Sequence, residues 1–305
     1  MKSSVSSRGL FLAALLLGVT SLNAFAVSES GSMLKVFTCA DDEGIHFYVQ
    51  NLTLANVTAS FEMNMTNMQA NANFPYTTTV AGNQTVEAFN LTPVDTNQVW
   101  TYTFVRTSSF GSADATPDDA FVYSLPYAPG SSFKVSQGYH GKFSHSGPDD
   151  YAIDWRMPVG TPVCAARGGL VVKSKDDDER SGSDRKYEKS ANCILIQHAD
   201  GTIGIYGHLK KGGNQVKVGD QVKTGDVIAL SGNTGFSNGP HLHFSVFKML
   251  DGKTRLSVPV KFRSADHGVV TLAQGIHYTA APVEGQRDEG PNFASNLKMI
   301  LSALP

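Results

Sequence analysis

A His-x-His pair lies in the apolar run HLHF at His241–Phe244. Because side chains of a β-strand alternate between its two faces, a strand here would present both imidazoles on one face. Two neighbouring imidazoles suit a metal ion, or a metal ion with a catalytic base beside it. Two ordinary histidines in a half-buried strand are the alternative, since so short a motif also occurs by chance.

Three segments upstream extend this pattern. A loop with His145 leads into a strand-like run with Asp154, and a second such run ends at His208. Residues 216–230 predict short strands separated by Gly-Asp turns. In this order, and followed by GNTGFSNGPHLHF, the segments resemble the lysostaphin/LytM-type zinc metalloendopeptidase family, which cleaves cell-wall peptidoglycan. The resemblance extends from about Gln137 to about Phe247.

The resemblance implies a fold, a cofactor and a substrate. The catalytic domain would be an antiparallel β-groove, a duplicated hybrid motif, with zinc (Zn2+) on its floor. The metal ligands would be His145, Asp154 and His243. His208 and His241 would be the catalytic groups beside the metal, and which of the two is the base stays open. A peptide cross-link of peptidoglycan would be the substrate, because an extended chain can bind along a sheet.

The chain departs from the family pattern at one point. The family spacing is His-x-x-x-Asp, which Asp149 satisfies, whereas Asp154 follows His145 by nine positions. We expect Asp154 to be the ligand, because the surrounding YAIDW and PVGTPV match the family's frame. Asp149 follows a proline in an apparent loop, where a solvated turn is expected. A longer loop between two ligands costs little chain entropy. His140 is the rival for the first ligand position.

The N-terminal residues predict export. Residues 1–26 have the pattern of a secretory signal peptide, with Lys2 and Arg8 before an apolar run and Ala24-Phe25-Ala26 at the cleavage site. The apolar run is too short for a membrane span, so we expect a periplasmic or extracellular protein without a transmembrane segment. A net charge of −2 over 305 residues argues against nucleic acid as a partner. The oligomeric state is not indicated.

The rest of the chain divides by composition. Residues 27–125 alternate polar and apolar positions without helical periodicity, which predicts an all-β chain with an N-terminal β-sandwich-like accessory domain. That domain would bind substrate or cover the site. Residues 126–262 would be the zinc endopeptidase domain, and residues 263–305 a tail with a helix from Phe293 to Leu301. The charged insert Lys173–Lys189 predicts a solvated loop.

The chain has three cysteines. In an oxidising compartment Cys164 and Cys193 are candidates for a disulfide, which would leave Cys39 over. Two buried thiols are the alternative.

Three functions fit these features. The first is an exported zinc metalloendopeptidase that hydrolyses peptide cross-links of peptidoglycan. The second is a non-catalytic relative that binds peptidoglycan or activates an amidase. The third is a secreted protease with glycine-rich protein targets outside the wall. Non-catalytic relatives usually lack one or more zinc-site residues, whereas all five candidates are present here, which favours an enzyme.

Overall fold

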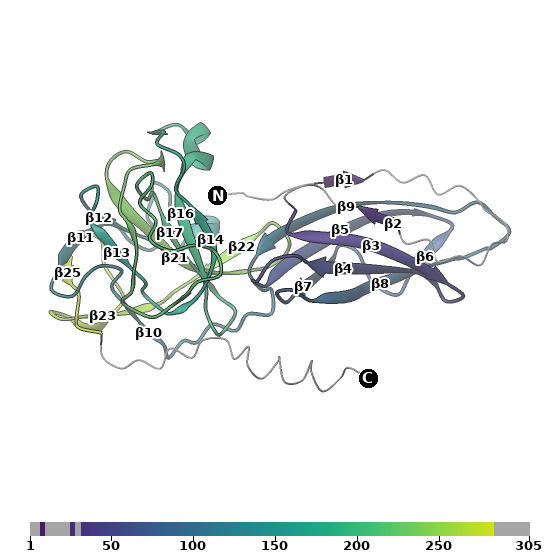
Figure 1. Cartoon of the computed structure of the whole chain (residues 1–305), viewed down its shortest axis with the longest axis horizontal. Helices are drawn as coiled ribbons and strands as arrows, with labels where there is room; N and C mark the ends of the chain where they lie inside the picture. Colours follow the sequence, from purple (N-terminus) through teal and green to yellow (C-terminus); the bar gives the residue numbers. More distant parts are fainter. Residues whose placement is uncertain (1–6, 10–24, 28–31, 284–305) are drawn as a thin grey trace. The chain divides into compact units, whose positions relative to one another are not determined.

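The computed structural model describes residues 7–9, 25–27 and 32–283 (Figure 1). This part of the chain is almost entirely β, as predicted, with two 3-10 helices, η1 (Gly147–Asp149) and η2 (Arg185–Ser190). No helix in it is long and apolar enough to cross a membrane. Of the predicted signal peptide, only the short strands β1 (Ser7–Gly9) and β2 (Phe25–Val27) fall among the described residues. The predicted helix at residues 293–301 lies outside them.

The described chain forms two compact units. One contains residues 7–9, 25–27, 32–114 and 249–255, and the other contains residues 115–248 and 256–283. The domain limits expected from the sequence stay predictions.

The first unit is a β-sandwich. One sheet has the order β1-β9-β5-β7 and the other the order β2-β3-β4-β8-β6, and all pairings are antiparallel. Aromatic rings fill the space between the sheets: Phe61 of one sheet meets Phe89 of the other with ring centroids 5.5 Å apart. The strands not yet given are β3 (Leu34–Asp41), β4 (Gly44–Asn51), β5 (Val57–Thr66), β6 (Met68–Ala70), β7 (Tyr76–Val80), β8 (Thr85–Pro93) and β9 (Thr101–Phe110).

The second unit is built on a nine-stranded antiparallel sheet. Its order is β18-β14-β16-β17-β21-β12-β11-β25, with β22 also paired to β21. The strands are β11 (Ser132–Gln137), β12 (Ile153–Arg156), β14 (Gly169–Lys175), β16 (Cys193–Gln197), β17 (Ile203–Gly207), β18 (Gln221–Val222), β21 (His241–Met249), β22 (Arg255–Val258) and β25 (His277–Thr279).

Three small sheets complete this unit. The first has the order β10 (Val122–Ser124), β23 (Lys261–Ser264), β24 (Gly268–Val270). In the second, β13 (Pro162–Cys164) pairs with β19 (Val227–Leu230), and in the third, β15 (Ser181–Gly182) pairs with β20 (Gly235–Phe236). No residue of the charged insert is buried, as its composition predicts, but the insert is not simply a loop, because it contains β15 and most of η2. Strand β15 pairs with β20, where the carbonyl oxygens of Arg180 and Gly182 accept hydrogen bonds.

The core of the second unit positions the functional face of the sheet. Trp155, Leu242 and Phe244 are almost completely buried in it. Because they alternate with Asp154 and His243 along β12 and β21, these polar residues point to the opposite face of the sheet. Burial of the apolar positions therefore sets the orientation of the polar ones.

The predicted disulfide between Cys164 and Cys193 is wrong. Neither residue forms a disulfide, nor does Cys39. Cys164 ends β13, which pairs with β19, whereas Cys193 begins β16 in the large sheet. Both lie buried as small apolar residues, and burial raises the pKa of the Cys164 thiol.

Candidate metal centre and active site

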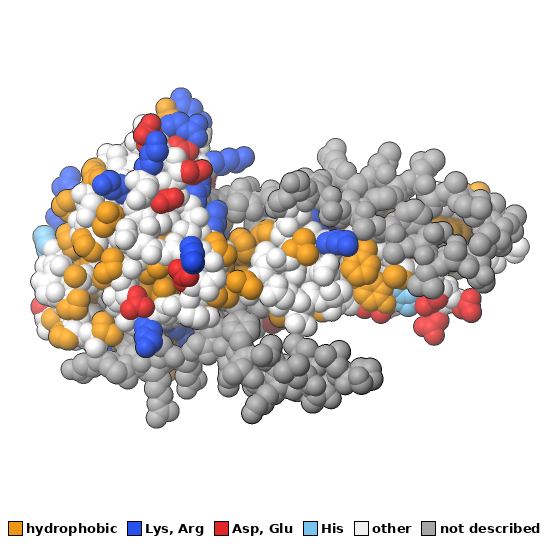
Figure 2. All heavy atoms as spheres, viewed as in Figure 1, with side chains coloured by type: hydrophobic (Ala, Val, Ile, Leu, Met, Phe, Trp, Pro, Cys, Tyr) orange, Lys and Arg blue, Asp and Glu red, His pale blue; other side chains and the backbone are white. Residues whose placement is uncertain are grey.

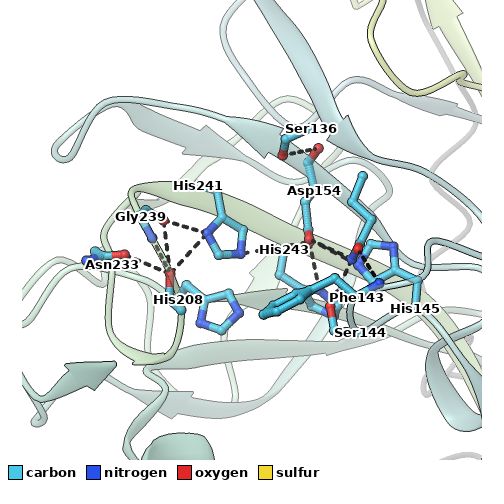
Figure 3. A network of polar contacts seen from close by, with 12 residues as sticks. Ser136, Phe143, Ser144, His145, Asp154, His208, Asn233, Gly239, His241 and His243 are labelled. Carbon is cyan, nitrogen blue, oxygen red and sulfur yellow. Dashed lines mark hydrogen bonds and ion pairs between the residues drawn. The ribbon is translucent and has the colours of Figure 1, made fainter. Parts of the chain in front are cut away.

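Three predicted ligands converge on the central strands of the large sheet (Figure 3). His145 comes from the loop after β11, Asp154 from β12 and His243 from β21. The strand register sets Asp154 directly opposite His243. Asp154 Oδ2 lies 3.1 Å from Nε2 of His145, and Asp154 Oδ1 lies 3.0 Å from Nδ1 of His243. One potential ligand atom from each residue lies within 4.8 Å of the others.

The protonation of His145 tests whether this cluster suits a metal ion. Its Nδ1 lies 2.9 Å from the carbonyl oxygen of Gly138, which can only accept a hydrogen bond, so Nδ1 carries the proton in the neutral ring. Nε2 is then unprotonated. It is buried without a hydrogen-bond partner among the described residues, although it faces Asp154 Oδ2. A lone pair facing a carboxylate oxygen calls for a cation near both, and two imidazoles with one carboxylate are a donor set that Zn2+ takes in catalytic sites.

The charges of the cluster offset the cost of burying its members. Burial alone would lower the pKa of His145, but the carboxylate of Asp154, 3.1 Å from Nε2, outweighs burial and raises it, so the site favours a positive charge at Nε2, either a proton or a metal cation. Burial would likewise raise the pKa of Asp154, but His145 and His243 hold it well below its usual range. Asp154 is therefore a carboxylate, the form that binds a cation.

Gln137 supports the site, and sequence reasoning missed it. Its side-chain amide donates to Ser144 Oγ at 2.8 Å and to Asp154 Oδ2 at 3.3 Å, and its Oε1 accepts from the backbone N–H of Phe143 at 3.2 Å. Gln137 thus ties the loop that carries His145 to the strand that carries Asp154. No short motif signals it, because its pairing with Asp154 depends on the register of β11 against β12.

A second histidine pair lies beside this cluster. The rings of His208 and His241 have centroids 4.5 Å apart, and the rings of His208 and His243 have centroids 5.8 Å apart. Nδ1 of His208 lies 2.7 Å from the carbonyl oxygen of Thr234, and Nδ1 of His241 lies 2.8 Å from that of Gly239. Both rings therefore carry the Nδ1 proton when neutral, which leaves Nε2 as an acceptor.

These two histidines differ in their surroundings. Burial, together with the nearby His241 and His243, lowers the pKa of His208 to about 3, so its ring is neutral at neutral pH. Nε2 of His241 lies 4.0 Å from Asp154 Oδ1, and its Nδ1 also meets Ser237 Oγ at 3.2 Å. The side chains of His241 and His243 are 17% and 16% exposed, so a large substrate can reach them.

The backbone of His208 is held in an uncommon conformation. Its φ is +60°, in the left-handed region that costs a residue with a Cβ atom about 1 kcal/mol or more. This turn directly follows β17 and brings the imidazole beside His241. Such strain persists only where the surrounding structure enforces it, and it is frequent at functional sites.

The two rivals for the ligand positions lie outside the cluster, and the strand that leads to His208 adds a tyrosine to the core. Asp149 lies in η1 and is not part of the cluster. His140 packs its ring on Tyr151, with centroids 5.1 Å apart. Tyr206 is buried in the core, where its hydroxyl accepts a hydrogen bond from the backbone N–H of Ala166.

Comparison with known proteins gives a consistent result. Residues 149–256 match the model of Peptidase family M23. The peptidoglycan DD-endopeptidase ShyA of Vibrio cholerae is 36% identical over 93 residues, which cover 30% of this chain and 19% of that protein. The glycyl-glycine endopeptidase ALE-1 of Staphylococcus capitis is 35% identical over 125 residues, 40% of this chain and 32% of that protein. The chain thus matches only a minor part of the length of these relatives.

Solved structures include the catalytic domain of lysostaphin from Staphylococcus simulans. The aligned residues are 29% identical and cover 42% of this chain and 87% of the lysostaphin domain. The TM-score of the superposition is 0.30.

Proposed function

Since residues 149–256 are a domain of peptidase family M23, of the lysostaphin/LytM type that the sequence resembles, we propose that the chain is an exported zinc metalloendopeptidase that hydrolyses peptide cross-links of peptidoglycan. The observation that carries the proposal is the cluster of His145, Asp154 and His243, with an unprotonated, buried Nε2 of His145 facing the Asp154 carboxylate. The relatives that are peptidoglycan and glycyl-glycine endopeptidases support a cell-wall peptide as the substrate.

His145, Asp154 and His243 would hold the ion. Zn2+ bound there would supply a Lewis acid that acidifies water and polarises the carbonyl group of the peptide to be cleaved. Two neutral imidazoles and one carboxylate leave the loaded site with a net positive charge. This charge favours the negative oxygen that develops when water adds to the peptide carbonyl.

His208 and His241 would handle protons. Each offers an unprotonated Nε2, with Nδ1 held by a backbone carbonyl, so each ring is oriented before substrate binds. One imidazole would accept a proton from the attacking water. The other, or the same one once protonated, would donate a hydrogen bond to the oxygen of the tetrahedral intermediate or a proton to the leaving amine.

Digestion of purified peptidoglycans tests this function. Chemically distinct walls, with direct and with glycine-containing cross-links, would be incubated with zinc-loaded protein, and the fragments identified by mass spectrometry. We expect new amino and carboxyl ends within the cross-link, abolished by a chelator. If zinc-loaded protein bound peptidoglycan without releasing fragments, the non-catalytic relative would replace the enzyme. Cleavage of a glycine-rich protein but of no wall would favour the secreted protease.

A further inference from the structure

Two phenylalanine rings stack beside the candidate active site. The rings of Phe143 and Phe236 have centroids 5.6 Å apart and lie within 9° of parallel. Phe143 is 58% exposed although it is large and apolar. An exposed aromatic side chain held in a fixed position at the edge of a site is a common feature of binding surfaces.

Both rings are connected to site residues through short stretches of chain. Phe143 lies two positions before His145 (Figure 3), and its N–H donates a hydrogen bond to Gln137, which also contacts Asp154. Phe236 directly precedes Ser237, whose hydroxyl contacts the His241 ring. The stack therefore joins the loop that carries one predicted metal ligand to the segment that carries one predicted catalytic histidine.

The charged insert also contacts the segment that carries Phe236. Strand β15 of the insert pairs with β20, and the carbonyl oxygens of Arg180 and Gly182 accept hydrogen bonds from the N–H groups of Gly235 and Ser237. Lys and Arg side chains, with some acidic ones, gather at this end of the unit (Figure 2). The Arg185 guanidinium carbon lies 5.4 Å from the centre of the Phe236 ring.

Arg185 is exposed. Among the described residues no ion pair involves it, whereas the neighbouring Asp184 pairs with Lys186. A guanidinium that lies over an aromatic face keeps its N–H donors at its edge, where they can bind a carboxylate in a bidentate manner. A cation beside an exposed apolar surface thus suits a ligand with an apolar stem and an acidic end.

We propose that Phe143, Phe236 and Arg185 form a specificity subsite that binds a free carboxylate group of the peptide substrate. The rings would contact the aliphatic part of the substrate residue, and Arg185 would bind its carboxylate. The subsite rests on the proposed peptidase function, and it adds a substrate class, namely peptides with an unamidated acidic group close to the cleaved bond.

The test compares two forms of one ligand. A synthetic cross-linked peptidoglycan peptide would be used with its side-chain and terminal carboxyl groups free, and again with these groups amidated. Isothermal titration calorimetry on chelator-treated protein measures binding of both, and kcat/KM is measured with zinc-loaded protein. We expect the wild-type protein to prefer the acid form by roughly fivefold in affinity, the size of an exposed charge-assisted hydrogen bond. Arg185→Gln should reduce this preference to about onefold.

Lys189→Gln is the matched control, because it removes an exposed positive charge from the same 3-10 helix. This variant should keep the preference, and both variants should keep the wild-type melting temperature. Equal binding of the two peptides by wild-type protein, or an unchanged preference in Arg185→Gln, would overturn the subsite even if cleavage is seen. An Arg185-dependent preference without any cleavage would support the subsite and count against the peptidase function.

Discussion

Asp154 lies directly opposite His243 across the pairing of β12 and β21, with its Oδ1 atom 3.0 Å from Nδ1 of His243. The relationship is made by two adjacent strands and does not depend on a loop. It explains why an aspartate nine positions beyond His145 belongs to the metal cluster, while Asp149, which has the shorter family spacing, lies in η1 outside that cluster.

This geometry predicts the metal content of two aspartate variants. Asp154→Asn should lose most bound zinc and all detectable activity, because the carboxylate is the only negative ligand of the cluster. Asp149→Asn should bind about one zinc per chain, as the wild-type protein should. Metal analysis after dialysis decides between them. Loss of zinc from Asp149→Asn alone would mean that the wrong aspartate has been assigned.

Gln137 should matter for metal binding although it is not a ligand. Gln137→Ala removes the hydrogen bonds to Ser144 and Asp154 and frees the His145 loop. We expect zinc affinity or kcat/KM to fall roughly tenfold, the usual effect of removing a group that orients metal ligands. Gln215→Ala, which removes a hydrogen bond to a nearby backbone oxygen in another loop, is the control. Competition with a fluorescent zinc chelator measures the affinity.

The left-handed backbone of His208 predicts that a glycine variant at this position is more stable than an alanine variant. His208→Ala and His208→Gly both remove the imidazole, so both should retain zinc and lose about 10²- to 10⁴-fold in kcat. At φ +60° glycine avoids the strain of a Cβ atom, so the glycine variant should be more stable than the alanine variant by roughly 0.5–1 kcal/mol. Urea unfolding of the two variants measures this difference in the free energy of unfolding. At ordinary strand positions the order is the reverse.

The sandwich unit contains a pH-dependent contact. Nδ1 of His46 lies 2.7 Å from Glu87, and Nε2 lies 3.1 Å from Asp41. The hydrogen bond to Glu87, and then the contact with Asp41, outweigh the effect of burial and raise the pKa of His46 above 6.5. A raised pKa means that the folded state binds the proton more tightly than the unfolded state.

The stabilisation from His46 should therefore be complete below pH 6.5 and be lost as the pH rises through the folded-state pKa. Wild-type protein should melt at a lower temperature at pH 8.5 than at about pH 6, and His46→Gln should show a smaller difference. His277→Gln, at an exposed histidine, should behave as wild type. An NMR titration of the His46 ring measures its pKa directly, and a value below the model-peptide range of about 6.5 would contradict this account.

The cysteines should all be present as thiols. Unfolding in urea without a reductant, followed by alkylation, should label Cys39, Cys164 and Cys193 together, as counted by intact mass. A species protected at Cys164 and Cys193 until reduction would contradict the structure.

The sequence predicted those parts of the site that follow from local periodicity. Alternation along His241–Phe244 placed both imidazoles on one face, because Leu242 and Phe244 had to enter the core. The contribution of Gln137 depends on the register of two strands, which no short motif specifies. The disulfide prediction failed for a related reason. Two cysteines in nearby strands need a specific separation and orientation of their Cβ atoms, and the number of residues between them carries no information on either.

The placement of the site in the sheet has a consequence for how such a protein can change. Asp154 and His243 lie on β12 and β21, in the interior of a nine-stranded sheet, where amide hydrogens exchange only through large opening events. Arg185 lies in η2, a peripheral segment whose replacement leaves those strands intact, whereas Phe143 shares its loop with His145. Under the proposed function, substitutions around Arg185 would alter which peptides bind, at little thermodynamic risk to the metal cluster. Proteins that descend from such a chain would then differ in substrate selectivity and keep the same reaction.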